Sequence, residues 1–110
     1  MVSYKAPLDD IHFALHEVNN YAATVGSLPG YDEATPDLLA AILEEAARFF
    51  EQELLPLNQS GDQEGCHFEN GVVRTPSGFK QAYDKFVEGG WNGISAPEAY
   101  DGGGLPSAVA

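Results

Sequence analysis

The sequence predicts an all-α fold, a small helical domain of about three helices with one short hairpin-like excursion. Three stretches repeat apolar residues at spacings of three and four, which is the period of an amphipathic helix. Two of them follow a Thr-Pro pair, at Thr35-Pro36 and Thr75-Pro76, which is typical of a helix start. Between them, Asn70-Gly71 is typical of a two-residue hairpin turn. The length of 110 residues fits one domain.

The N-terminal part, residues 1–34, is expected to hold one helix and its connector. The helix is predicted to begin at Pro7, with Asp9 and Asp10 next to the positive end of its dipole. Its apolar stripe consists of Leu8, Ile11, Leu15 and Val18. Asparagine, glycine and proline residues break this pattern over 19–34 and predict an irregular connector. We expect three large side chains to anchor it, namely Tyr21, Leu28 and Tyr31.

Residues 35–110 carry the strongest helical signal. Thr35 is a good N-cap, Pro36 suits the first helical position, and Asp37 complements the dipole. The wide apolar face that follows consists of Leu38, Leu39, Ile42, Leu43, Ala46, Phe49, Phe50 and Leu54. Pro56 is expected to end this helix, and a polar loop is predicted to follow over 58–65.

The last predicted helix has the same capping pattern as the previous one. Thr75 is its expected N-cap, Pro76 its first residue and Gly89 its C-cap. Its apolar face consists of Phe79, Ala82, Tyr83, Phe86 and Val87. Directly after it, Trp91 is expected to pin the following segment to the core. By composition alone, a flexible end is the less favoured interpretation of the glycine-rich tail that follows.

The net charge argues against two classes of binding partner. Seventeen acidic against five basic residues give a formal charge of −12. This balance argues against nucleic acid and anionic membranes, which are bound through clustered Lys and Arg. It also makes the chain alone a poor receptor for a polyphosphate ligand. No segment approaches the roughly 20 apolar residues of a membrane span, and no targeting segment is evident, so the protein is expected to be cytoplasmic.

Several residues are candidates for a metal site or a nucleophile. His12 and His16 lie at i and i+4 on a predicted helix, but no third ligand follows at a suitable spacing, so two half-exposed histidines are the favoured interpretation. Cys66 is the only cysteine, which excludes an internal disulfide, and its acidic flanks disfavour the thiolate that a nucleophile needs. Three serines lack the G-x-S-x-G elbow of a nucleophile: Ser60, Ser77 and Ser95.

The acidic and glycine-rich residues also lack the pattern of a catalytic or nucleotide-binding site. Glu44 and Glu45, and likewise Glu51 and Glu53, could suggest paired carboxylates, yet a solvated helix face is the favoured interpretation. Gly102, Gly103 and Gly104 do not follow a strand within a βαβ unit, so a nucleotide-binding loop is weakly supported. From the residues alone we therefore assign no catalytic residue and no metal ligand, and the cofactor-binding residues stay unknown.

The tail carries a resemblance to a known family. The segment "GGWNGISAPEAYDGGGLP" resembles the one that closes the early helices of acyl-CoA dehydrogenases. The matching residues are Gly90, Trp91, Gly93, Ile94, Pro97, Tyr100, Gly102, Gly104 and Leu105. Asp101 departs from the pattern, which has glycine there. Nearly the whole chain looks like the longer subgroup of this family, which includes the 3-methylmercaptopropionyl-CoA dehydrogenases.

The resemblance implies an oxidoreductase of fatty acid metabolism. Members are flavoproteins in which a glutamate removes an α-proton of an acyl-CoA thioester while hydride passes to FAD. Electrons then move to an electron-transfer flavoprotein. The catalytic glutamate comes from a C-terminal helical bundle that follows a middle β-domain. Residues 35–110 would thus be an incomplete family member, the N-terminal helical domain without the middle and C-terminal domains.

For this chain the resemblance implies a fragment of an FAD-dependent parent. On its own it is predicted to be inactive and not to hold FAD. In the parent, a homo-oligomer, it would shape one wall of the acyl site. The alternative is a stand-alone acidic helical interaction module without catalysis.

Overall fold

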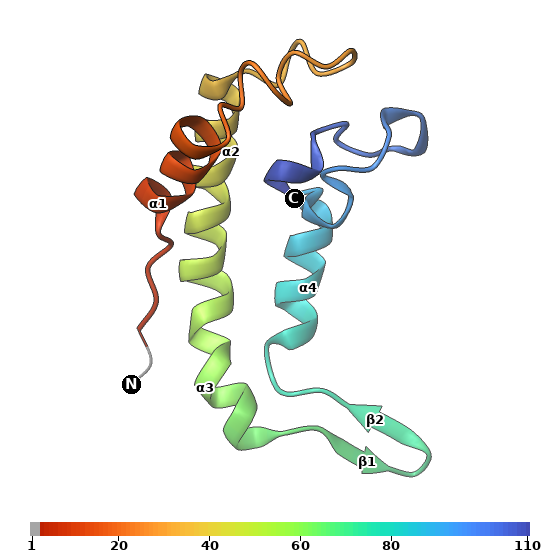
Figure 1. Cartoon of the computed structure of the whole chain (residues 1–110). Helices are drawn as coiled ribbons and strands as arrows, with labels where there is room; N and C mark the ends of the chain where they lie inside the picture. The colour runs from red at the N-terminus through yellow and green to blue at the C-terminus, as the bar shows by residue number, and fades with distance from the viewer. Residues whose placement is uncertain (1–2) are drawn as a thin grey trace.

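Three helical rods lie side by side in the computed structural model, which describes residues 3–110 (Figure 1). The first rod joins α1 (Leu8–His12) to a π-helical segment, η1 (Phe13–Val18). The second joins α2 (Pro36–Phe49), a π-helical segment η2 (Phe50–Leu54) and α3 (Leu55–Glu64). The third is α4 (Phe79–Glu88). The predicted fold class, all-α with about three helices, is confirmed.

The first rod and its connector follow the prediction with two corrections. The helix begins at Leu8, so Pro7 is its N-cap and not its first residue. Tyr21 anchors the connector, because its side chain is only 1% exposed and its hydroxyl donates a 2.8 Å hydrogen bond to the Ala34 carbonyl. Tyr31 packs against the buried cluster of Tyr21, Ala34 and Leu39. Leu28 is 49% exposed, so it is not the anchor we expected.

The second rod contradicts the prediction that Pro56 ends the helix. The chain stays helical to Glu64, and the expected polar loop over 58–65 is instead most of α3. A proline in an α-helix removes one backbone hydrogen bond and clashes with the carbonyl four residues earlier. The wider π-helical turn η2 ends at Leu54 and changes this spacing, so Pro56 is the second residue of a new α-helical segment.

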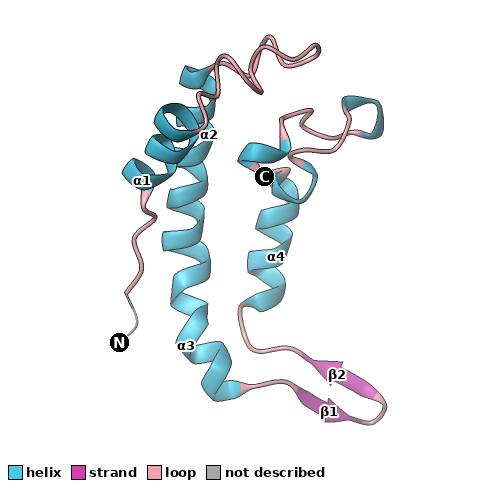
Figure 2. Ribbon diagram, in the orientation of Figure 1, coloured by secondary structure: helices cyan, strands magenta, loops and turns pink. Residues whose placement is uncertain are grey.

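The hairpin forms as predicted. Strands β1 (His67–Glu69) and β2 (Val72–Arg74) are antiparallel, with Phe68 opposite Val73. Asn70 and Gly71 have φ angles of 52° and 77°, the left-handed values that a tight two-residue turn requires. Figure 2 shows the two strands projecting from the ends of α3 and α4. Every strand residue is exposed.

The start of α4 differs from the prediction. Thr75 is not its N-cap and Pro76 is not its first residue, because the helix begins at Phe79 after Gly78. The Glu64 carboxylate explains the shift, since it accepts hydrogen bonds from both the backbone N–H and the hydroxyl of Ser77, each at 3.0 Å. These bonds tie the segment to the end of α3 before the helix can start. Gly89 is the C-cap, as predicted.

The molecule is flat and has a small core. Its Cα atoms span 54 × 36 × 17 Å, and the thinnest dimension accommodates little more than one layer of helices. The buried hydrophobic core of the described chain consists of Tyr21, Ala34, Leu39, Ala47 and Ala82, and two prolines, Pro76 and Pro106, are buried as well. The accessible surface is 7872 Å², whereas a compact monomer of this mass exposes roughly 5,900 Å². About 2,000 Å² of surface is thus in excess of what a closed domain would show.

Candidate functional site

The glycine loop, residues 90–105, is a closed and hydrogen-bonded structure. The backbone N–H of Gly103 donates to the Gly93 carbonyl at 2.9 Å, and that of Gly104 donates to the Ala96 carbonyl at 2.9 Å. The Leu105 N–H donates to the Ile94 carbonyl at 3.1 Å. The second half of the loop therefore folds back along the first half, which is not the structure of a flexible end.

Two glycines allow this close backbone approach. A Cβ on Gly102 would overlap the carbonyl oxygen of Ala96, and one on Gly103 would lie 2.7 Å from the carbonyl oxygen of Ile94. Asp101 has a φ angle of 63°, so the residue that departs from the family pattern adopts the left-handed conformation, which aspartate tolerates better than most residues. Asp101 therefore adopts a backbone conformation that is open to glycine.

An aromatic cluster attaches the loop to the helices. The ring centroid of Trp91 lies 6.4 Å from that of Phe49 in the second rod, and Phe49 lies 6.2 Å from Phe86 of α4. These separations are typical of contacting aromatic rings. The expectation that Trp91 pins the following segment is confirmed. Beyond the loop, Leu105 and Val109 pack against the core of Tyr21 and Leu39.

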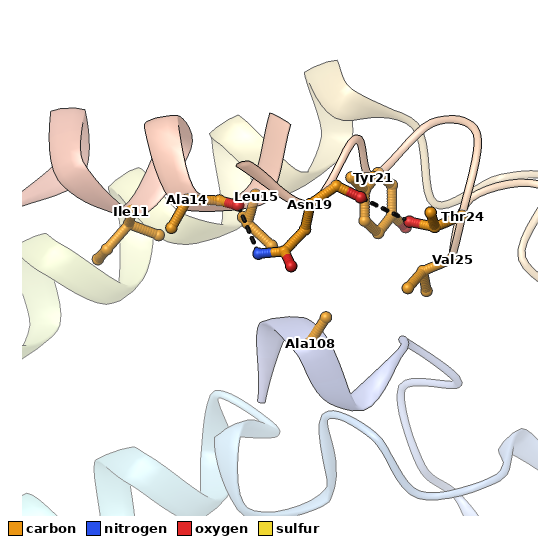
Figure 3. A pocket seen from close by; sticks show the side chains of 8 residues that line it. All are labelled: Ile11, Ala14, Leu15, Asn19, Tyr21, Thr24, Val25 and Ala108. Carbon is orange, nitrogen blue, oxygen red and sulfur yellow. Dashed lines mark hydrogen bonds between the residues drawn. The ribbon is translucent and has the colours of Figure 1, made fainter. Parts of the chain in front are cut away.

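An apolar groove lies between the first rod and the end of the tail (Figure 3). It encloses about 590 Å³, and its lining consists of Ile11, Ala14, Leu15, Asn19, Tyr21, Thr24, Val25 and Ala108. The polar side chains among these, Asn19, Tyr21 and Thr24, each donate a hydrogen bond within the chain. The Asn19 amide donates to the Ala14 carbonyl at 2.7 Å, and the Thr24 hydroxyl donates to the Asn19 carbonyl at 3.0 Å. The groove therefore offers an apolar surface and no reactive group.

A second hollow, of about 540 Å³, adjoins the glycine loop. Gly103 and Gly104 line it together with three acidic residues, Asp32, Glu33 and Glu98. Carboxylates at this position repel a phosphate group. This hollow therefore does not fit the pyrophosphate of a flavin nucleotide or of coenzyme A.

The histidines and the cysteine do not assemble into a reactive site. The His12 and His16 rings stack with centroids 5.9 Å apart, and both are half-buried on the first rod. In residues 3–110 no group of three or more His, Cys, Asp or Glu side chains is arranged to hold a metal ion. Cys66 is exposed just before the hairpin.

The glutamates noted in the sequence take part in structural contacts. Glu44 and Glu45 both pair with Arg48, at 3.5 and 2.9 Å. Glu51 accepts a 2.8 Å hydrogen bond from the Ala6 backbone N–H, while Glu53 pairs with Lys85 at 2.7 Å. Glu51 and Glu53 therefore tie the second rod to the N-terminal segment and to α4, respectively.

Two of the three serines also take part in structural hydrogen bonds. The Ser60 hydroxyl donates to the Pro56 carbonyl at 3.2 Å, and the Ser77 hydroxyl is held by Glu64. Ser95 is exposed.

Sequence reasoning missed both the apolar groove and the contacts of Glu51 and Glu64. Each joins segments far apart in the chain, and the spacing of residues carries no signal for such pairs. Within the described residues, no helix combines the length and the apolar character needed to cross a bilayer.

Comparison with known proteins identifies a matching protein family and a curated relative. The family described as "Acyl-CoA dehydrogenase, N-terminal domain" matches residues 37–110. A curated relative, 3-methylmercaptopropionyl-CoA dehydrogenase from Ruegeria pomeroyi, is 42% identical over 108 residues. That alignment covers 98% of this chain and 18% of the relative, so the chain spans less than a fifth of the length of the curated relative that it matches.

Proposed function

Because this chain belongs to the acyl-CoA dehydrogenase family, we propose that it is the N-terminal helical part of a flavin-dependent dehydrogenase acting on an acyl-CoA thioester. The observation that carries the proposal is the 42% identity to a 3-methylmercaptopropionyl-CoA dehydrogenase along nearly the whole chain. The division at residue 35 and the cytoplasmic location belong to the same proposal.

The chain's share in the reaction is structural. The glycine loop, fixed to the helices by Trp91, would present its backbone to the acyl site as one wall. FAD, when bound to the parent, accepts the hydride. The acidic hollow beside the loop argues that the parent holds the phosphates of FAD and coenzyme A with residues outside this chain. We assign three further features to the parent. These are the base that removes the α-proton, the contact with an electron-transfer flavoprotein, and homo-oligomer assembly.

Flavin content and turnover test the proposal. We expect the purified 110-residue chain to be colourless and to reduce no electron acceptor with any acyl-CoA. The parent should show flavin absorbance and should reduce an acceptor when given an acyl-CoA such as 3-methylmercaptopropionyl-CoA. A yellow and active 110-residue preparation would refute the proposal that this chain is inactive without the rest of the parent. A parent that turns over no acyl-CoA would refute the proposed dehydrogenase activity.

A stand-alone acidic interaction module is the second candidate, favoured by the formal charge of −12. It requires apolar faces that are covered without other domains. A monomer that unfolds cooperatively and binds no hydrophobic dye would support this candidate. Dye binding or aggregation supports the fragment, because large exposed apolar patches are normally interaction surfaces.

A further inference from the structure

The chain contains two Asn-Gly pairs, Asn70-Gly71 and Asn92-Gly93, which lie in different surroundings. In such a pair the backbone nitrogen of the glycine can attack the side-chain carbonyl of the asparagine, because glycine has no side chain that blocks the approach. Both asparagines are exposed, so access to water does not distinguish the two pairs. The hydrogen bonding of the glycine backbone does distinguish them.

The Asn92-Gly93 pair is held by the glycine loop. The Gly93 N–H donates to the Gly90 carbonyl at 3.2 Å, and the Gly93 carbonyl accepts from the Gly103 N–H at 2.9 Å. Gly93 is also the last residue of a short 3-10 helix. For its nitrogen to react, the hydrogen bond to Gly90 must break and the closed loop must open.

The Asn70-Gly71 pair lies at the tip of the hairpin and lacks this support. In the turns and loops of residues 3–110, no backbone carbonyl accepts a hydrogen bond from the Gly71 N–H. A Cβ on Gly71 would meet no heavy atom within 4 Å beyond its two chain neighbours. The attack requires Asn70 to leave its left-handed turn, and the hairpin allows this, because its three-residue strands are exposed and a lone hairpin is only marginally stable.

We propose that Asn70 is a site of spontaneous deamidation, and that the glycine loop protects Asn92 from the same reaction. The Gly71 nitrogen loses its proton and bonds to Cγ of Asn70, and the bond from Cγ to the amide nitrogen breaks as ammonia leaves with that proton. The product is a cyclic imide. Water then adds to either ring carbonyl and breaks its bond to the ring nitrogen, which gives aspartate or isoaspartate at position 70.

The isoaspartate product changes the hairpin, whereas the aspartate product does not. Aspartate has an ordinary backbone and tolerates the left-handed conformation that Asn70 adopts. Isoaspartate routes the main chain through the side chain and inserts a methylene group into the turn, so the observed register of His67 with Arg74 is lost. The hairpin joins the ends of α3 and α4 (Figure 2), and the modification therefore loosens this connection.

Mass spectrometry of peptides from the aged parent tests the proposal. The folded parent is incubated in neutral buffer, and the peptides that contain Asn70 and Asn92 are followed over time. Asn70 should convert about tenfold faster than Asn92 or more, because an open minor state that frees the Gly93 nitrogen is at most about a tenth populated. Equal conversion at the two asparagines, or no conversion at Asn70, would overturn the proposal.

Incubation in guanidinium chloride is the control for local sequence. Both pairs are then part of an unfolded chain, and their rates should become similar. An Asn92 that stays slow in denaturant would contradict protection by the glycine loop. Neither incubation uses flavin or turnover, so the outcome is independent of the proposed dehydrogenase activity.

Trypsin cleavage after Arg74 measures the effect on the hairpin, since a protease cuts a paired strand mainly when it opens. The aged wild-type parent should be cut faster than the fresh parent. Asn70→Asp has the charge of the product with an ordinary backbone, and when fresh it should be cut as slowly as fresh wild type. Asn70→Gln, whose longer side chain closes the ring much more slowly, should keep its fresh rate after ageing. Equal cleavage of fresh and aged wild type would contradict the loss of register.

Discussion

At the scale of single residues, Tyr21 makes the most consequential contact of the core. Its ring is 1% exposed beside Leu39 and Ala34, and its hydroxyl bonds the Ala34 carbonyl. The backbone hydrogen bonds of the connector are local, such as the one from the Leu28 N–H to the Val25 carbonyl. The Tyr21 hydroxyl bond spans 13 residues and fixes the return of the chain to the start of α2. His16 adds an edge-on contact, with ring centroids 6.0 Å apart. One side chain therefore holds the first rod, the connector and the second rod together.

Tyr21→Phe tests this role. The substitution keeps the ring but leaves the Ala34 carbonyl without its partner, and we expect the free energy of unfolding to fall by about 1–2 kcal/mol. Urea unfolding followed by the fluorescence of Trp91, the only tryptophan, measures the change. Tyr83→Phe is the matched control, because Tyr83 is 63% exposed and should tolerate the loss of its hydroxyl. Equal losses in both variants would contradict the assignment.

The same residue predicts a dependence on pH. Burial, with a smaller effect of the nearby Tyr31 charge, raises the pKa of Tyr21 above its ordinary value. The folded state therefore keeps this proton at pH values where the unfolded chain releases it. Stability from this group is full below the ordinary tyrosine pKa of about 10 and falls as pH rises from there through the raised pKa. Urea titrations should show a steeper loss above pH 10 in the wild type than in Tyr21→Phe.

At the scale of elements, two Thr-Pro pairs with the same sequence signature have different structures. The Thr35 hydroxyl accepts a 3.2 Å hydrogen bond from the Leu38 N–H and caps α2, whereas Thr75 lies four residues before Phe79, where α4 begins. Thr35→Ala should therefore cost about 1 kcal/mol of stability, and Thr75→Ala should change it by less than about 0.5 kcal/mol. Thermal melts followed by circular dichroism check both. A loss at Thr75 as large as that at Thr35 would contradict the observed start of α4.

This pair shows which part of the fold the sequence can predict. The cap at Thr35 and the turn at Asn70-Gly71 depend on residues that are neighbours in the chain, so their patterns predicted them correctly. The end of the second rod and the start of α4 depend on the π-helical turn before Pro56 and on the Glu64–Ser77 contact across 13 residues. The spacing of residues in the sequence predicts neither the π-helical turn nor the Glu64–Ser77 contact. The apolar groove likewise joins Ile11 and Ala108, and no local pattern could indicate it.

At the scale of the whole molecule, the layer of rods is held by few contacts. The Lys85–Glu53 ion pair and the aromatic cluster around Phe49 join α4 to the second rod, and the hairpin bridges their far ends. A lone two-stranded hairpin is only marginally stable in water. We expect the chain to keep its flat shape in solution, because the second rod is helical without a break from Pro36 to Glu64.

Small-angle X-ray scattering checks that shape directly. The Cα radius of gyration is 17.2 Å, whereas a compact domain of this length would have about 13 Å and an unfolded chain about 34 Å. We expect a dilute sample to give a value close to 17.2 Å, because the π-helical continuation through η2 holds the second rod extended along the 54 Å axis. Measurement over a series of concentrations separates this elongation from self-association, which raises the value as concentration increases. A concentration-independent value near 13 Å would mean that the rods close on each other, and the flat shape would not exist in solution.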